Sequence, residues 1–178
     1  DGPHTLQLYG VEGVIGIDAF ITQLAPIDRT EAGTIWYVSP FGNDTRSCLT
    51  ENLSCRTIQA TIDKASAGDI IMLRFGTYNA PFIVNKDITI NKLGYADTII
   101  DGTGLSTSIV TVNAGVSVTI NDLTIQNGTS GTEIDGLRVG GGIYNQGNLT
   151  LNNVIVSDNR VQGDNAIGDQ GGGRSPAG

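Results

Sequence analysis

The sequence predicts an all-β fold: a parallel β-helix of about four coils, with one capping helix and an extended N-terminal arm. Three observations lead to this prediction: a repeat at fixed spacing, alternation of apolar and polar residues within each repeat, and many Gly and Asn residues where the chain must turn. Repeats of short, β-rich units are typical of a solenoid, in which each unit buries its apolar face only by stacking on its neighbours.

The clearest repeat joins residues 119–147 to those that follow. Shifted forward by 31 positions, Thr119 falls on Thr150 and Ile125 falls on Val156. Within each copy an Asn separates two runs of alternating residues, which predicts a strand, a corner and a second strand. We expect the inward side chains of one coil to stack on those of the next, namely Ile120, Leu123 and Ile125 on Leu151, Val154 and Val156.

The same unit recurs upstream in weaker form. Residues 87–91 (DITIN) align with 117–121 (SVTIN) at an offset of 30. Residues 108–115 precede one copy as 141–147 precede the next, and 70–86 form the first coil, with two apolar runs broken at a glycine. The Asn residues at the corners predict an internal amide ladder that satisfies turn backbone groups, formed by Asn91, Asn121 and Asn152.

Length and charge limit the possible functions. The 178 residues, of which 39% are hydrophobic, suffice for one core, and the net charge is −8. Binding of nucleic acid or of an anionic membrane surface needs clustered Lys and Arg, and no such patch is present in the sequence. No apolar run reaches the ~18 residues of a membrane span.

The cysteines and sequons predict an exported protein. Cys48 and Cys55 lie seven residues apart in a polar loop, outside any CxxC pattern, and we expect them to form a disulfide; two buried thiols are the alternative. The chain begins without Met, as a processed product does after signal peptide removal, so we expect an extracellular or cell-surface location. Four Asn-x-Ser/Thr sequons are candidate glycosylation sites: Asn43, Asn52, Asn127 and Asn148.

Residues 1–33 do not fit the repeat, and we expect them to form an arm preceding the β-helix domain at 34–178. The arm either covers the first coil or pairs with another molecule. Residues 57–67 predict the capping helix, with Thr57 as its N-cap and Gly68 ending it. The apolar residues of the arm are Leu6, Leu8, Val11, Val14, Ile15, Ile17, Phe20, Ile21 and Leu24.

Two stretches resemble a known superfamily. The segments WYVSPFGNDTRSC and CRTIQATIDKASAGDIIMLRFGTY resemble the N-terminal cap of pectate-lyase-like right-handed β-helix proteins. The segment GGGIYNQGNLTLNNVIVSDN resembles the repeats of bacterial surface β-helix proteins, including polymorphic outer-membrane-type adhesins. The resemblance implies a right-handed β-helix, but the superfamily includes lyases, hydrolases, esterases, tailspikes and adhesins, so it does not fix the activity.

Catalytic residues are not evident in the sequence. A lyase of this superfamily would need acidic calcium ligands and a basic residue. Glu133 and Asp164, at an offset of 31, are the one stacked acidic pair and a candidate Ca²⁺ site; a solvated corner loop is the alternative interpretation. The only histidine, His4, lies in the arm, and otherwise we expect no cofactor.

We therefore expect a non-enzymatic extracellular structural or adhesive protein. In this hypothesis it is a subunit of a surface fibre that assembles head to tail, because the N-terminal arm of one subunit adds a strand to its neighbour. The expected partners are further copies of the chain and, in addition, cell-surface glycans. The alternative is a carbohydrate-active β-helix enzyme of the polysaccharide lyase type, or a fragment of one.

Overall fold

The computed structural model describes residues 33–130, 133–134 and 137–161. The arm, apart from Gly33, lies outside these ranges. The described part of the chain is mainly β-strand with one α-helix, as the all-β prediction requires. The predicted arm side chains that lie outside it are Leu6, Leu8, Val11, Val14, Ile15, Ile17, Phe20, Ile21 and Leu24.

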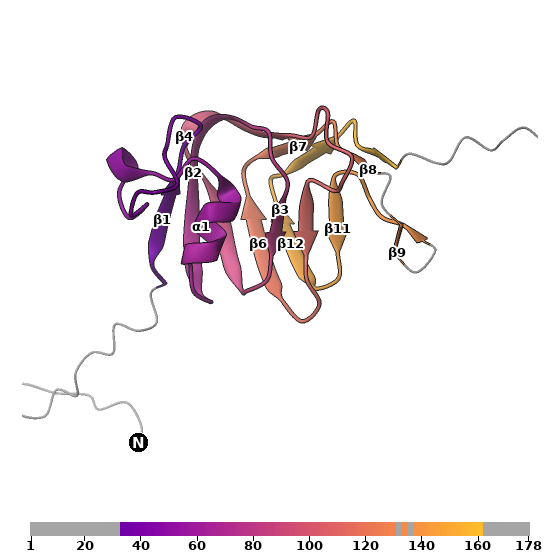
Figure 1. The fold of residues 1–178 in the computed structure, drawn as a ribbon, viewed down its shortest axis with the longest axis horizontal. Coiled ribbons are helices and arrows are strands. Elements are labelled where there is room, and N and C mark those ends of the chain that lie inside the picture. Colours follow the sequence, from indigo (N-terminus) through magenta and orange to yellow (C-terminus); the bar gives the residue numbers. More distant parts are fainter. Residues whose placement is uncertain (1–32, 131–132, 135–136, 162–178) are drawn as a thin grey trace, which may run out of the picture. The chain divides into compact units, whose positions relative to one another are not determined.

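The largest sheet contains seven parallel strands. Five of them lie in the order β1-β2-β4-β6-β12, and β7 joins the far half of β4 to β13 (Figure 1). The long strand β4 therefore pairs with β6 through its first half and with β7 through its second. The bounds are β1 Ile35–Val38, β2 Asp69–Tyr78, β4 Ile88–Asp101, β6 Ser117–Asn121, β7 Thr124–Gln126, β12 Asn148–Asn152 and β13 Ile155–Ser157.

Smaller sheets complete the described unit. A parallel sheet of three strands has the order β11-β5-β3, and β8 pairs in parallel with β14. The antiparallel pair is β9 with β10. Their bounds are β3 Phe82–Val84, β5 Val110–Val112, β8 Thr129–Ser130, β9 Glu133–Ile134, β10 Leu137–Arg138, β11 Ile143–Asn145 and β14 Arg160–Val161.

The register confirms the repeat read from the sequence. Thr119 pairs with Thr150 and Ile125 with Val156, both at the predicted offset of 31. The upstream copy is confirmed too, because Ile88 to Asn91 pair with Val118 to Asn121 at an offset of 30. Strands β5 and β11 pair as expected from the segments preceding each copy.

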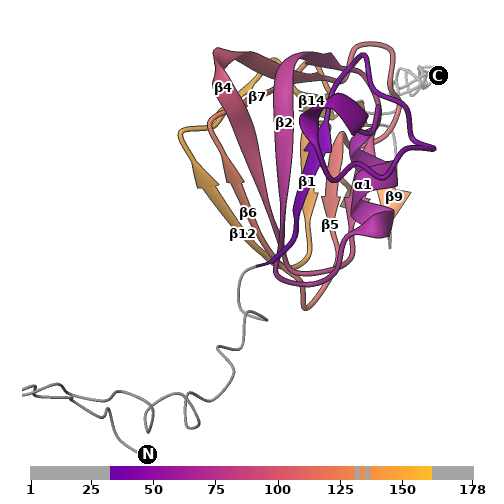
Figure 2. The same cartoon turned by 90° about the vertical axis from the view of Figure 1, so that its left-hand side faces the viewer.

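The core lies between the large sheet and the sheet formed by β3, β5 and β11. Figure 2 shows β2, β4, β6 and β12 on one side and β5 with α1 on the other. Alternate residues of each strand face inward, as the pleat of a β-strand requires. The deeply buried side chains of β2, β3, β4, β5, β6 and β7 include Ile71, Leu73, Phe82, Val84, Ile90, Ile100, Val110, Val112, Ile120 and Ile125.

Burial falls towards the last strands. Ile120 and Ile125 are fully buried, whereas their register partners Leu151 and Val156 are 38% and 48% exposed. The predicted stacking is thus present, but only the earlier member of each pair has a layer of strands on both sides within the described residues. The last strands present core-type side chains at an edge.

Gly76 breaks the first predicted coil, as expected. Its φ is 127° and the register of β2 against β4 shifts there, between Arg74 and Gly76. A Cβ at this position would lie 2.9 Å from the Cγ atom of Pro40. A side chain is excluded here both by the backbone conformation and by the space available.

The helix is shorter than predicted. Helix α1 spans Ile58–Lys64, and Thr57 is its N-cap as expected, since its hydroxyl accepts a hydrogen bond from the Ala60 N–H at 3.2 Å. It ends at Lys64, with Ala65 as its C-cap, rather than at residue 67. The Asp69 carboxylate accepts the Ser66 N–H at 2.7 Å, and this bond draws the chain out of the helix before Gly68.

The packing predicts unequal costs for two Leu→Ala substitutions. Leu123 is 3% exposed, so Leu123→Ala should lower the free energy of unfolding by about 2–5 kcal/mol. Leu151→Ala is the matched control and should cost clearly less, because this side chain is already 38% exposed. Denaturant unfolding of both variants measures the difference. Equal costs would mean that the inward face has been assigned wrongly.

Candidate functional site

The first edge of the large sheet is closed by the polar loop that follows β1. The N–H of Tyr37 donates to the Cys48 carbonyl at 2.8 Å, and the Tyr37 carbonyl accepts the Cys55 N–H at 2.9 Å. The Ser39 N–H donates to the Cys55 carbonyl at 2.9 Å. These bonds occupy the outer side of β1 at Tyr37 and Ser39, where an edge strand would otherwise offer free groups to another chain.

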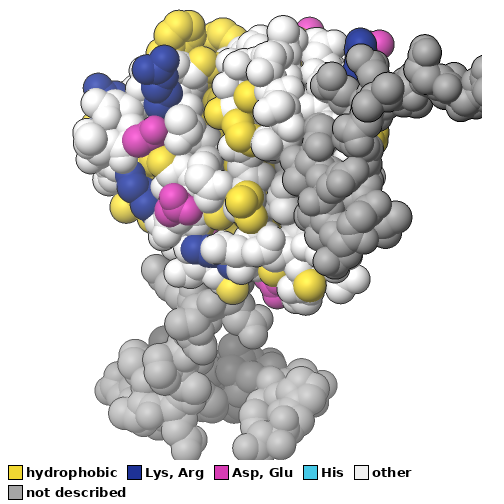
Figure 3. Space-filling view, turned by 45° about the vertical axis from the view of Figure 1, so that its right-hand side comes forward, with side chains coloured by type: hydrophobic (Ala, Val, Ile, Leu, Met, Phe, Trp, Pro, Cys, Tyr) yellow, Lys and Arg dark blue, Asp and Glu magenta, His cyan; other side chains and the backbone are white. Residues whose placement is uncertain are grey.

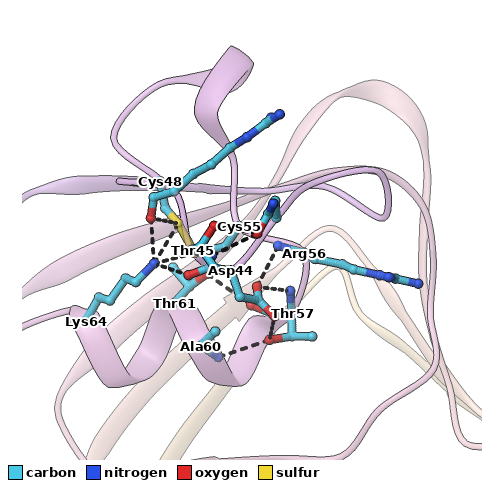
Figure 4. The surroundings of a disulfide bond; sticks show 11 residues. Asp44, Thr45, Cys48, Cys55, Arg56, Thr57, Ala60, Thr61 and Lys64 are labelled. Atoms are coloured by element: carbon cyan, nitrogen blue, oxygen red, sulfur yellow. Dashed lines mark hydrogen bonds between the residues drawn. A yellow bond between two sulfur atoms is a disulfide. The ribbon is translucent and has the colours of Figure 1, made fainter.

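A disulfide fixes this closing loop, as predicted. Cys48 and Cys55 are bonded to each other and fully buried. The ammonium group of Lys64, on α1, donates to the carbonyls of Asp44 and Arg46 at 2.6 Å each and lies 3.3 Å and 3.5 Å from the two sulfur atoms (Figure 4). The loop is therefore attached to the helix as well as to β1. Helix α1 itself packs against β1 and β3.

Asp44 ties the same loop to the start of the helix. Its carboxylate accepts the N–H groups of Arg56 and Thr57 at 2.7 and 2.9 Å, and the Thr57 hydroxyl at 3.0 Å (Figure 4). Partial burial acts to raise the pKa of Asp44, but these hydrogen bonds and the charge of Lys64 outweigh it and hold the pKa below its ordinary value. Asp44 is thus an ionised structural group.

The opposite edge of the sheet presents exposed apolar side chains. Among the described residues, no strand pairs with the outer sides of β12 and β13, or with that of β14, which belongs to the small sheet with β8. Four large hydrophobic side chains lie exposed on these strands, including two whose partners in the preceding layer are fully buried. They are Leu151 at 38%, Ile155 at 61%, Val156 at 48% and Val161 at 46% exposed.

The asparagine ladder exists, but its predicted internal position is wrong. The Nδ2 group of Asn121 donates to Asn91 Oδ1 at 2.5 Å, and that of Asn152 donates to Asn121 Oδ1 at 2.7 Å. Because Ile90 and Ile120 point inward, the adjacent Asn side chains must point outward. The amides therefore satisfy one another on the outer face of the sheet rather than capping turn backbone groups.

A second polar stack surrounds Asp101, at the end of β4. Its carboxylate accepts the Thr103 N–H at 2.8 Å and the side-chain amides of Gln126 and Asn127 at 3.0 and 3.1 Å. The pKa of Asp101 is lowered to about 2, mainly because hydrogen bonds from Thr103 and Gln126 stabilise the ionised carboxylate. Asn127 has a φ of 59°, so this bond also fixes a corner in the left-handed conformation.

The four sequons differ in accessibility. Asn43, Asn52 and Asn148 are exposed, and Asn43 accepts two hydrogen bonds from Thr45 within its own turn. Asn127 is half-buried, and its amide nitrogen is the group that donates to Asp101. The exposed sequons are therefore the better candidates for modification.

The predicted acidic pair is not tested by the structure. Asp164 and His4 lie outside the described residues, and only the backbone of Glu133 is described. No group of three or more His, Cys, Asp or Glu side chains able to hold a metal occurs within the ranges that are described. In those same ranges no helix is long and apolar enough to cross a membrane.

The chain is similar to a remote relative among known proteins. No family model matches the chain. The chain is 27% identical over 165 residues to a protein of Bacillus subtilis (strain 168) named uncharacterized protein YwoF. The match covers 86% of this chain and 34% of that protein, so the chain spans about a third of the relative's length. At this identity the relative does not establish a family or an activity.

The Asp101 stack predicts a pH dependence of stability. A carboxyl whose pKa is about 2 in the folded state and ~3.9 when unfolded stabilises the fold above pH ~4. This contribution is lost as the pH falls through the folded pKa. The difference in free energy of unfolding between the wild type and Asp101→Asn should therefore shrink from pH ~5 to pH ~2.

The control is Asp97→Asn, which removes the same charge at an exposed position. A difference that stays constant over this range would contradict the assignment.

Proposed function

We propose that this chain is a non-enzymatic extracellular structural or adhesive module built as a right-handed parallel β-helix. The parallel pairs at offsets of 30 and 31 residues support successive coils of such a helix. The resemblance of the cap and repeat segments to β-helix proteins supports its handedness. The buried disulfide is compatible with an oxidising, extracellular compartment.

The observation that carries this proposal is the difference between the two edges of the large sheet. The first edge is bonded to the disulfide loop at Tyr37 and Ser39. The last edge presents exposed apolar side chains in the register of the core. An edge of this kind favours addition of another strand, which main-chain hydrogen bonds and burial of the apolar row would both stabilise.

Assembly into a fibre follows from this difference. Because the disulfide loop occupies the outer side of β1, β1 itself is a poor donor for a neighbour's last edge. The arm at residues 1–33 is the proposed donor strand, and a head-to-tail contact of this type is open and propagates. This step rests on the apolar sequence of the arm.

The alternative function, carbohydrate-active catalysis, has weaker support. A lyase of this type needs carboxylate oxygens that are free to coordinate Ca²⁺. The carboxylates of Asp44 and Asp101 instead accept several hydrogen bonds from their own chain, and these bonds also lower their pKa values. Asp69 is held in the same way: burial acts to raise its pKa, but the Ser66 N–H, the Trp36 side chain and the Thr34 N–H outweigh it. These carboxylates hold segments together.

Self-association of the full chain tests the proposal. Sedimentation and negative-stain microscopy should show linear assemblies, and deletion of residues 1–32 should abolish them. Val156→Lys, which places a charge on the last edge, should also weaken assembly, whereas Ile83→Lys, at an exposed β3 position, is the matched control.

Two results would contradict the proposal. One is a full-length chain that stays monomeric at high concentration, or a truncated chain that assembles as well as the full one. The other is turnover of polyuronates in the presence of calcium, which would favour the enzyme.

A further inference from the structure

Two exposed phenylalanines and two arginines surround a small cavity beside the disulfide loop. Phe41 is 87% exposed and Phe75 is 50% exposed. Together with Arg46 and Arg74 they line a cavity of about 200 Å³, here named the Phe–Arg pocket. Its remaining lining residues are polar: Ser39, Glu51, Asn52 and Ser54.

The pocket is held in shape from several sides. The Asn43 N–H donates to the carbonyl of Ser54, one of the lining residues, at 3.0 Å, which joins the two ends of the loop. The guanidinium of Arg46 donates to the Asn52 carbonyl at 3.1 Å. The backbone of Arg74 is fixed by the buried hydroxyl of Tyr78, which donates to the Arg74 carbonyl at 2.8 Å. The Arg46 guanidinium and the backbone that carries the other lining residues are therefore held in place before a ligand binds, which lowers the entropy cost of binding.

The arginines give the pocket a positive charge. Two guanidinium groups and one carboxylate line it, on a chain whose net charge is −8. The guanidinium carbon of Arg74 lies 5.9 Å from the centre of the Phe75 ring, so cation and aromatic ring form one surface. In Figure 3, Lys and Arg side chains, with a few Asp and Glu, stand among hydrophobic ones along the left-hand side of the unit.

We propose that the Phe–Arg pocket binds a sugar ring that carries an anionic group, within a glycan chain. The apolar C–H face of a pyranose ring packs on an aromatic ring, and the two phenylalanines offer such faces. Arg46 and Arg74 donate charge-assisted hydrogen bonds to a carboxylate or sulfate. Glu51 and Asn52 supply acceptors and donors for hydroxyl groups. This inference gives the proposed adhesive function its ligand class and rests on that function.

Other ligands use only part of the pocket. A free inorganic anion would bind the arginines and leave both phenylalanines in water. An apolar peptide or lipid chain would cover the phenylalanines but leave Glu51 and the arginines without partners, which is costly when they are desolvated. An acidic peptide is the remaining competitor, and the experiment below includes it.

Binding is tested with the full chain and four soluble polymers. Affinity electrophoresis compares polygalacturonate, a sulfated glycosaminoglycan, neutral dextran and poly-glutamate. We expect retardation by at least one anionic polysaccharide, none by dextran, and weaker or no retardation by poly-glutamate. The two anionic polysaccharides distinguish a carboxylate from a sulfate.

Substitutions then assign the binding to this pocket. Phe41→Ala with Phe75→Ala should weaken binding by about tenfold or more, and Arg74→Gln should do so too. Tyr95→Ala, which removes a fully exposed aromatic ring outside the pocket, and Arg160→Gln, which removes an exposed charge on β14, are the matched controls. Circular dichroism verifies that each variant is folded.

Three results would overturn the inference: no binding to any anionic polysaccharide, binding that the phenylalanine variants leave unchanged, or equal retardation by poly-glutamate with the same dependence on the phenylalanines. If binding fails while the full chain still assembles and shows no turnover, only the pocket is wrong. If the chain turns over a polysaccharide, the proposed function itself is wrong.

Discussion

The main-chain ladder of the large parallel sheet is the constraint on which the rest of the structure depends. Each strand layer buries its inward side chains only because another layer lies on each side of it, so a ladder always leaves two edges to be satisfied. At the first edge the chain uses a loop of its own, stapled by the Cys48–Cys55 disulfide and bonded to Tyr37. At the last edge no strand of the described residues covers the exposed apolar side chains of Leu151 and Val156. This difference is the origin of the proposed directional assembly.

Polar side chains stabilise the layers at positions that the apolar core cannot reach. The amides of Asn91, Asn121 and Asn152 bond to one another along the outer face. Asp101 gathers Thr103, Gln126 and Asn127 at a corner. The bonds between the Asn amides, and those from Gln126 and Asn127 to Asp101, run between successive layers, so they fix the same register that the buried rows of Ile and Val require. The polar and apolar contacts therefore specify a single alignment of the repeats.

Most of the fold followed from the sequence because the repeat spacing fixes the pairing register. The offset of 31 residues alone predicts that Ile125 lies opposite Val156, and the structure has this pair. Local patterns predict less, because contacts outside the local segment decide the outcome. The end of α1 depends on Asp69, a residue beyond the helix, and the outward position of the Asn ladder follows from the alternation of side chains along the strands rather than from turn chemistry. The disulfide was predicted, but its role in closing the edge was not, since the bond between Tyr37 and Cys48 depends on how the loop folds back over β1.

The Phe–Arg pocket has no signal in the sequence, because Phe41 and Phe75 come from segments that only the fold brings together.

Amide hydrogen exchange at the first edge tests the central claim most directly. In the native chain the amides of Tyr37 and Ser39, which donate to Cys48 and Cys55, should exchange slowly, as closed main-chain hydrogen bonds do. In a chain carrying both Cys48→Ser and Cys55→Ser, these two amides should exchange much faster, while the amide of Ile90, in the middle of the ladder, stays protected. Removing this short crosslink should also cost stability near the low end of ~2–4 kcal/mol. Rapid exchange of Tyr37 and Ser39 in the native chain, or equal protection with and without the disulfide, would show that the loop does not close the edge.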